Sequence, residues 1–232
     1  MSAFLCRLFV QDELKSGLDI LLKKEDAHYL KNVLRAETGQ DLRLFNGKYG
    51  EFSGEVLEIS KNSCVIHVKS LLRPQASPPP ITLYFAPLRQ NRMDTLIEKT
   101  VELGLLEFRP ILTDFTQVRK INIERIQVQI KEASEQSEQL HVAKISDPVK
   151  FDHVLKQKNL WICDESRTGN HILNMNPPEE IHLVIGPEGG FSSREKELMK
   201  NHTKVSLGHS ILRAETAAIC AIGFTNYLLT KS

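Results

Sequence analysis

The chain reads IHLVIGPEGGFS at residues 181–192, an apolar run that leads directly into a glycine-rich turn. Such a run is typical of a buried parallel strand, and the pair Ser192 and Glu195 predicts that a capped helix follows at once. The carboxyl end of a parallel strand is where α/β sheets bind nucleotide-like ligands, and glycines let a ligand approach the backbone closely. The turn matches neither the dinucleotide fingerprint nor the phosphate-binding P-loop, so a plain tight turn is an equal alternative on local grounds.

A second glycine turn of the same kind lies further along the chain. Leu207 and Gly208 end a short strand and lead into ILRAETA at residues 211–217, so a second strand end feeds a second helix. Arg213 and Glu215 stand at the start of this helix, two positions apart, where side chains do not face each other. We therefore expect them to address different partners, with a solvated helix start as the alternative for each.

Strands alternate with helices from residue 81 onward. Apolar runs predict strands at 81–86, 108–112, 160–163, 181–185 and 205–207, and helical spacing predicts helices at 93–103, 121–140, 193–201 and 213–229. This alternation predicts a parallel sheet that is covered on both faces. Before it, strand-like runs around one helix at 26–37 predict a small, β-rich, barrel-like domain at 1–72. Four prolines predict a stiff linker at 73–80, which leaves 81–232 as the second domain.

Composition limits the classes of function. The 232 residues are 41% hydrophobic and 25% charged, which is typical of a globular protein. The 30 Lys and Arg residues against 29 Asp and Glu give a net charge of +1, which excludes an unselective, polybasic nucleic-acid binder but not an enzyme with local basic patches.

Metal sites, disulfides and membrane spans are not indicated. The four cysteines include no Cys-x-x-Cys pair and the eight histidines include no His-Glu-x-x-His helix, so we expect no metal and no disulfide framework. No run approaches the ~18 apolar residues that span a bilayer, and residues 1–11 lack the pattern of a signal peptide. We therefore expect a cytoplasmic protein without a membrane segment.

Five segments, taken together and in order, resemble the ribosomal RNA small subunit methyltransferase E family of the SPOUT methyltransferases. They are HYLxxVLR at 28–35, KTVELG at 99–104, EAxEQS at 132–137, IGPEGGFS at 185–192 and LGxxILRxETA at 207–217. The resemblance spans nearly the whole chain. This sequence departs from the family pattern at Gln139 and Ser210, where arginine is usual. The chain therefore has fewer basic residues in these segments than the family pattern.

The resemblance implies S-adenosylmethionine as methyl donor, a uridine N3 in the 16S ribosomal RNA of the small ribosomal subunit as acceptor, and a homodimer. It also implies an α/β fold, in which a SPOUT-type domain with a trefoil knot and a mainly parallel sheet follows a PUA-like RNA-binding β-barrel. The residues it assigns to the cofactor loops are Gly186, Pro187, Glu188, Gly189, Gly190, Leu207, Gly208, Ile211, Leu212, Thr216 and Ala217.

Methylation at uridine N3 requires that a weakly acidic proton leave. An unperturbed glutamate, with a pKa near ~4.3, is a feeble base for this proton. We therefore expect Arg213 to stabilise the negative charge that develops on the pyrimidine oxygens. Glu188 and Glu215 are the candidates for a base or a positioning residue.

RNA contacts must come from a few placed cations, because the net charge is close to zero. The candidates are Arg7, Lys31 and Arg35 in the first domain and Arg89, Arg92, Lys99, Arg119 and Lys120 in the second. Ordinary solvated surface is the alternative for each of them. Phe115 or Phe191 is a candidate for stacking on a flipped base, although core packing is commoner for such residues.

Two other functions fit parts of the sequence. A non-catalytic RNA-binding ribosome-assembly factor with the same fold would bind RNA but not S-adenosylmethionine. A nucleotide-dependent α/β enzyme acting on a small substrate would use the turn at Gly186 but would leave the β-rich first domain without a purpose.

Overall fold

The computed structural model describes residues 4–166 and 169–231 and divides into two compact units. The first unit comprises Met1–Ser77 and Ser134–Val142, and the second comprises Pro78–Ala133 and Ala143–Ser232. Residues 1–3 of the predicted first domain and residue 232 of the second lie outside the described residues. Residues 134–142, which the sequence assigns to the second domain, therefore group with the first unit.

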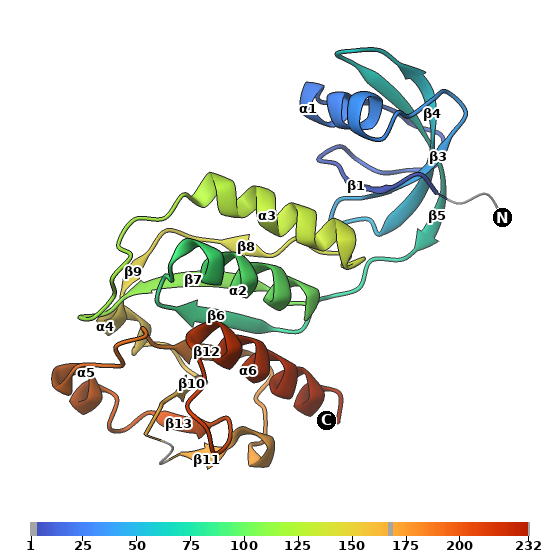
Figure 1. The fold of residues 1–232 in the computed structure, drawn as a ribbon. Coiled ribbons are helices and arrows are strands. Elements are labelled where there is room, and N and C mark those ends of the chain that lie inside the picture. Colours follow the sequence, from blue (N-terminus) through green and yellow to red (C-terminus); the bar gives the residue numbers. More distant parts are fainter. Residues whose placement is uncertain (1–3, 167–168, 232) are drawn as a thin grey trace. The chain divides into compact units, whose positions relative to one another are not determined.

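Within residues 4–77, five strands form one sheet (Figure 1). They are β1 (Arg7–Phe9), β2 (Asp19–Leu22), β3 (Asp41–Phe45), β4 (Glu51–Ile59) and β5 (Cys64–Arg73). The strand order is β1-β3-β4-β5-β2, with β1 and β3 parallel and the other neighbours antiparallel. Alternating residues such as Leu42, Leu44 and Ile66 are fully buried in one core, as expected of a sheet with one covered face.

The helix of the first unit differs from its predicted range of 26–37. It consists of α1 (Lys24–His28) and a π-helical turn at Tyr29–Val33. The amide of Leu34 donates to the carbonyl of Tyr29, and the amide of Ala36 donates to the carbonyl of Leu30. These wide turns end the helix early, and Arg35 takes a left-handed conformation with φ of 55°.

The described part of the second unit contains one sheet of eight strands, and every pairing between neighbouring strands is parallel. The strands are β6 (Ile81–Phe85), β7 (Glu107–Leu112), β8 (Lys144–Ile145), β9 (Val149–Lys150), β10 (Leu160–Cys163), β11 (Asn170–His171), β12 (Ile181–Ile185) and β13 (Thr203–Ser206). Their order is β11-β13-β10-β12-β6-β7-β8, with β9 also paired to β7. The mainly parallel α/β fold predicted from the alternation of elements is confirmed.

Helices cover both faces of this sheet (Figure 1). They are α2 (Gln90–Glu102), α3 (Ile123–Gln136), α4 (Phe151–Val154), α5 (Ser193–Leu198) and α6 (Ala214–Leu229). On one face Tyr84, Ile162 and Val184 pack against Phe151 of α4 and against Met199, which follows α5. The residues between them along each strand point to the opposite face. The short elements β8, β9, α4 and β11 were not predicted, because two to four residues are too few to show a period.

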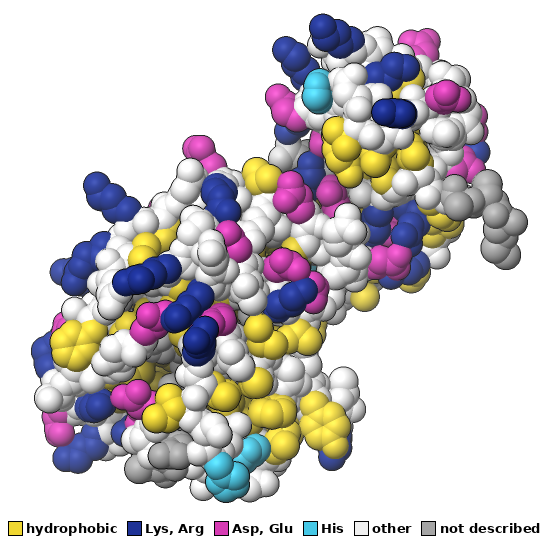
Figure 2. All heavy atoms as spheres, viewed as in Figure 1, with side chains coloured by type: hydrophobic (Ala, Val, Ile, Leu, Met, Phe, Trp, Pro, Cys, Tyr) yellow, Lys and Arg dark blue, Asp and Glu magenta, His cyan; other side chains and the backbone are white. Residues whose placement is uncertain are grey.

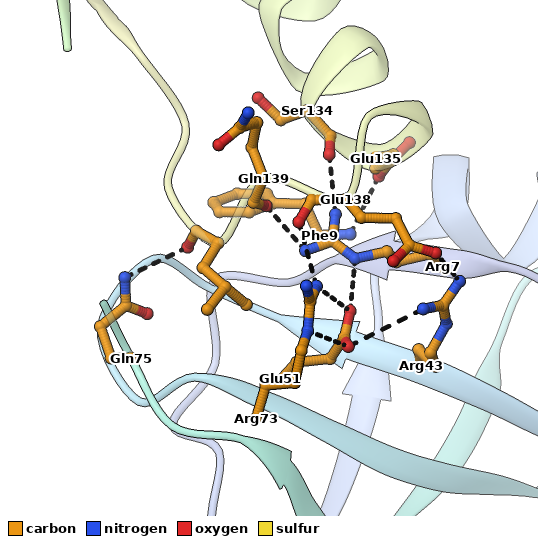
Figure 3. Close-up of polar contacts among 11 residues, drawn as sticks. Arg7, Phe9, Arg43, Glu51, Arg73, Gln75, Ser134, Glu135, Glu138 and Gln139 are labelled. Carbon is orange, nitrogen blue, oxygen red and sulfur yellow. Dashed lines mark hydrogen bonds and ion pairs between the residues drawn. The ribbon is translucent and has the colours of Figure 1, made fainter. Parts of the chain in front are cut away.

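The first unit contains a buried ion cluster that corrects one sequence prediction (Figure 3). Arg7, predicted to contact RNA, has a side chain only 3% exposed, and its Nε lies 2.5 Å from Oε1 of Glu51. Its Nη1 and Nη2 donate to the carbonyls of Ser134 and Gln139, each at 2.7 Å, and its guanidinium lies 3.6 Å from the centre of the Phe45 ring. Burial lowers the pKa of Arg7, while the Glu51 carboxylate acts in the opposite direction. Arg7 therefore holds the carboxyl end of α3 and is not available to RNA.

The end of α3 also differs from its predicted range of 121–140. The helix begins after Asn122, whose Oδ1 accepts the amide of Arg125 at 3.0 Å. It ends at Gln136, and Glu138 takes a φ of 58°, while the amide of Gln139 bonds back to Ser134. A left-handed residue at this position is a common way to end a helix.

No helix in residues 4–166 and 169–231 is long and apolar enough to cross a membrane. In the same residues, no group of three or more His, Cys, Asp or Glu side chains could hold a metal ion.

Candidate active site

The second unit has a cavity of about 310 Å³ at the carboxyl ends of β10, β12 and β13. Cys163 at the end of β10 lies in register with Ile185 of β12 and Val205 of β13, so the three strands end within one residue of the same level. The loops that follow them form the walls, and the first turn of α6 closes one side. The lining residues are Arg92, Cys163, Asp164, Glu165, Ile185, Gly186, Pro187, Glu188, Gly190, Phe191, Val205, Leu207, Gly208, Ser210, Ile211, Leu212, Arg213, Ala214 and Ala217.

Three glycines of the cavity wall have different reasons to be glycine. A Cβ on Gly186 would lie 2.7 Å from the ring of Phe191, so a side chain at this position would collide with the loop's own packing. Gly190 has a φ of 72° and Gly208 a φ of 136°, conformations that residues with a Cβ rarely adopt. The backbone of both loops is therefore exposed to the cavity in a way that other residues would not allow.

Two acidic residues that the sequence analysis did not single out, Asp164 and Glu165, line the cavity where β10 ends. Asp164 is 8% exposed, and its Oδ2 accepts a hydrogen bond of 2.5 Å from Oγ of Ser166 and lies 3.9 Å from Nζ of Lys204. Its Oδ1 is buried and forms no hydrogen bond with any described residue. A buried carboxylate oxygen without a donor is costly, so this atom is available to a ligand.

The neighbouring Cys163 also lines the cavity. Burial raises the pKa of its thiol to about 12, so the side chain stays uncharged at physiological pH. Cys163 therefore contributes apolar surface to the wall.

Arg92 connects two of the predicted catalytic carboxylates. Its Nη1 donates to Oε1 of Glu188, and its Nε lies 3.9 Å from Oε1 of Glu215. Glu215 does not line the cavity; it is 8% exposed, and its Oε2 forms no hydrogen bond with any described residue. Arg92, predicted to contact RNA, is thus committed to this acidic pair.

Arg213 occupies a different environment. It is the exposed residue that precedes α6, with φ of −65° and ψ of 154°, and it lines the cavity. It forms no ion pair with any residue that the structure describes. Of the two arginines in the cavity wall, Arg213 is therefore the one whose charge is not matched by a carboxylate.

Most of the residues predicted for the cofactor loops line this one cavity. The exceptions are Gly189 and Thr216, which lie in the same two segments but are exposed away from it. Sequence reasoning missed the β10 side, namely Cys163, Asp164 and Glu165, because no glycine motif marks the end of that strand. The only available signal was the apolar run at 160–163 followed by two acidic residues.

The remaining cations predicted to contact RNA fall into two environments. Lys31, Arg35, Arg89, Arg119 and Lys120 are exposed, whereas Nζ of Lys99 lies 2.8 Å from carboxylates of both Glu98 and Glu102. On the face of the second unit seen in Figure 2, Lys and Arg side chains are interleaved with Asp and Glu and do not form one continuous basic field.

Phe191 is not available for stacking on a flipped base. It is 5% exposed, and its ring stacks on Phe151 with a centroid distance of 5.0 Å. Phe115, the other candidate, is 51% exposed.

Two family models match the chain. One, described as an RNA methyltransferase domain, matches residues 75–226, and the other, described as an RNA methyltransferase PUA domain, matches residues 22–69. A relative from Rickettsia conorii named ribosomal RNA small subunit methyltransferase E is 35% identical over 93% of this chain and 93% of its own length. A relative of the same name from Synechocystis sp. is 29% identical and covers 96% of this chain and 78% of its own.

Two solved structures resemble this one over almost the full chain. A putative methyltransferase from Legionella pneumophila, in complex with the bound cofactor SAM, has a TM-score of 0.87 and 29% identity and covers 97% of this chain and 98% of its own. A ribosomal RNA small subunit methyltransferase E from Neisseria gonorrhoeae, bound to S-adenosyl methionine, has a TM-score of 0.87 and 26% identity, with coverage of 96% and 97%.

Proposed function

We propose, because this chain belongs to the ribosomal RNA small subunit methyltransferase E family, that it methylates N3 of a uridine in 16S ribosomal RNA. Its cofactor is S-adenosylmethionine, which supplies an electrophilic methyl group on a positively charged sulfur. The observation that carries the proposal is the cavity at the ends of β10, β12 and β13, where two glycine loops expose their backbone beside an arginine without an acidic partner.

The residues of the cavity fit this cofactor. The volume of about 310 Å³ lies at the lower end of the range for small-molecule sites, and the cavity joins apolar walls to a few polar groups. The Phe191 ring packs against Gly186, where a Cβ would lie 2.7 Å from it, so the shape of this loop depends on glycine. The free Oδ1 of Asp164 is an acceptor suited to the hydroxyl or ammonium groups of the ligand.

Two glycines of the same loop, Gly186 and Gly189, offer a matched test of this fit. We expect Gly186→Ala to weaken S-adenosylmethionine binding about 10-fold or more, because its Cβ would lie 2.7 Å from the Phe191 ring and displace the loop. Gly189→Ala should bind nearly as well as the unmodified protein, because a Cβ there meets Phe115 at an ordinary 3.5 Å. Isothermal titration calorimetry measures the dissociation constants of both variants. Equal affinities would contradict the steric role of Gly186 in shaping the loop.

Asp164 gives a second test. We expect Asp164→Ala to raise the dissociation constant for S-adenosylmethionine about 10- to 100-fold, because a charge-assisted hydrogen bond to the ligand is lost. Asp147→Ala removes an exposed carboxylate of the same unit and serves as the control. An unchanged affinity of the Asp164 variant, measured by calorimetry, would mean that Oδ1 has no ligand to satisfy it.

The chain's own groups then have three tasks in the reaction. The two loops hold the donor in line with the acceptor nitrogen, and such positioning supplies up to roughly 7–11 kcal/mol in favourable cases. As the bond from N3 to the methyl carbon forms and the carbon–sulfur bond breaks, the N3 proton leaves. Arg213 stabilises the negative charge on the pyrimidine oxygens, and Glu188 and Glu215, joined through Arg92, remain the candidates for positioning or for accepting the proton.

We also propose that exposed cations, Arg89, Arg119 and Lys120 among them, contact RNA phosphates and that the protein acts as a homodimer. Because the net charge is only +1 and the proposed contacts are few, we expect RNA affinity to depend only modestly on salt. Both proposals rest on family membership and on the distribution of exposed charge. Sedimentation velocity of the full chain tests the oligomeric state.

The decisive experiment is mass mapping of 16S ribosomal RNA from a strain that lacks the gene. We expect one N3-methyluridine to disappear and to return when the gene is restored on a plasmid. Unchanged N3-methyluridine would overturn the proposal. If the purified protein binds RNA but calorimetry detects no S-adenosylmethionine binding, a non-catalytic assembly factor is the better description.

A further inference from the structure

An exposed aromatic side chain lies beside the cofactor cavity in the second unit. Phe115 is 51% exposed and lines a shallow groove together with Arg89, Pro187 and Glu188. Pro187 and Glu188 also line the cofactor cavity, so the two depressions share one wall. A ligand held against Phe115 would therefore contact the same loop that holds the methyl donor.

The backbone that carries Phe115 is fixed by buried hydrogen bonds. The amide of Thr113 donates to Oγ1 of Thr116 at 2.8 Å, and the amide of Asp114 donates to Oε1 of Glu195 at 2.9 Å. Glu195 is fully buried and is part of the capping box that opens α5, directly after the glycine loop. The turn at 113–116 is thus attached to the cofactor loop's own helix.

A second set of contacts holds the same turn from outside. Oγ of Ser192 donates to Oδ2 of Asp114 at 2.5 Å, and Arg194 bridges Asp114 and Asp152. The turn is therefore rigid although the ring it carries is half in solvent. Phe115 has no aromatic or cationic ring partner among the described residues, so the fold gains little from having an aromatic side chain at this position.

The charges around the groove indicate what would cover the ring. Arg89 lines the groove, and the exposed Arg119 and Lys120 follow Phe115 within five residues. A flat hydrophobic ring with neighbouring cations is the arrangement by which proteins bind an unstacked base and its phosphates in single-stranded RNA. A rigid aromatic loses little conformational entropy when it stacks, which favours this use over a flexible apolar side chain.

We propose that Phe115 is the platform on which the acceptor pyrimidine stacks after it leaves the RNA base stack, with Arg89 contacting the adjoining phosphate. This inference rests on the proposed function, since it names the subsite of the same reaction. Phe115 then binds and positions the substrate base, whereas the buried Phe191 supports the loop from within.

Methyl transfer to 16S ribosomal RNA prepared without the modification tests the platform. We expect Phe115→Ala to lower kcat/KM for the RNA about 10- to 100-fold while the dissociation constant for S-adenosylmethionine is unchanged. Phe115→Trp should restore activity, because it offers an equal or larger stacking face. Tyr227→Ala removes an aromatic ring of similar exposure, 50%, that lines neither depression, and it should behave like the unmodified protein.

A fluorescence measurement separates stacking from catalysis. The only tryptophan of the chain is Trp161, so Phe115→Trp combined with Trp161→Phe leaves one reporter in the groove. A single-stranded RNA that carries the acceptor uridine should quench it, and the same RNA with an abasic site at that position should quench it much less. This readout does not need methyl transfer, so it fails independently of the proposed function.

Three results would overturn the inference. One is normal kcat/KM for Phe115→Ala; another is equal quenching by the intact and the abasic RNA. The third is a loss of activity on assembled small subunits but not on free 16S ribosomal RNA, which would show that Phe115 contacts a protein.

Discussion

Replacing Arg213 by alanine should lower the single-turnover rate of methyl transfer about 10²- to 10³-fold at saturating S-adenosylmethionine. Arg213 lines the cavity, precedes α6 and forms no ion pair with a described residue, so its charge is free to act on the acceptor. In the proposed reaction, negative charge develops on the pyrimidine oxygens as the N3 proton leaves. Arg92, the other arginine among the described residues of the cavity wall, is bound to Glu188, so Arg213 is the one that can stabilise this charge. Rapid-quench measurement with labelled cofactor gives the rate.

The matched variants define what Arg213 does. Arg213→Lys keeps the charge without the planar guanidinium and should recover part of the rate. Arg125→Ala removes an exposed arginine of the same unit that already forms two hydrogen bonds of 3.0 Å with Asp94, and it should leave the rate unchanged. If Arg213→Ala instead weakens S-adenosylmethionine binding and leaves the rate near normal at saturation, Arg213 is a cofactor-binding residue and the assigned role is wrong.

The parallel sheet could be predicted because its strands are buried on both faces. The runs at 160–163 and 181–185 are continuous and apolar, and each became a strand with the predicted bounds. The start of α5 could also be predicted, because Ser192 and Glu195 have the spacing of a capping box. Strands of two residues such as β8 and β9 carry no such signal, because a period of two cannot be recognised in so short a run.

The two glycine loops that line the cavity were predictable for a different reason. Gly186 is required by steric contact, and Gly190 and Gly208 by a positive φ. Each requirement dictates glycine, and a glycine can be seen in the sequence. No comparable sequence motif identifies Asp164. Its importance arises only from the register of β10 with its two neighbours, which brings a third strand end to the same cavity.

The predicted cations show where reading charge from a sequence fails. Arg7, Arg92 and Lys99 each looked like a solvent-facing cation, but all three have carboxylate partners. The partners of Arg7 and Arg92 lie 44 and 96 positions away along the chain, and those distances cannot be read from the residues around an arginine. Arg7 is therefore a structural residue of the first unit and not the RNA contact that the sequence predicted.

That change leads to the largest expected effect on stability. We expect Glu51→Gln to lower the free energy of unfolding of the first unit by about 3–5 kcal/mol, because it leaves the buried guanidinium of Arg7 without its carboxylate. Glu51 also accepts hydrogen bonds from Arg73 at 2.8 and 3.1 Å and lies 3.9 Å from Arg43, so one substitution removes a counterion of three arginines. Trp161 lies in the second unit, so the first unit should be followed by hydrogen exchange of the amides in β3, β4 and β5.

An exposed ion pair of the same sheet provides the control. Nζ of Lys69 lies 2.8 Å from Asp41 and 2.6 Å from Glu55, but all three side chains are open to solvent, and Lys69→Ala should leave the exchange of these amides within experimental error. A double-mutant cycle of Arg7→Met with Glu51→Gln should be strongly non-additive. Once Arg7 is gone, the second substitution takes the Glu51 carboxylate only from the more exposed Arg73 and Arg43. Additive losses of less than about 1 kcal/mol each would instead mean that water reaches the pair, and that Arg7 belongs to the surface after all.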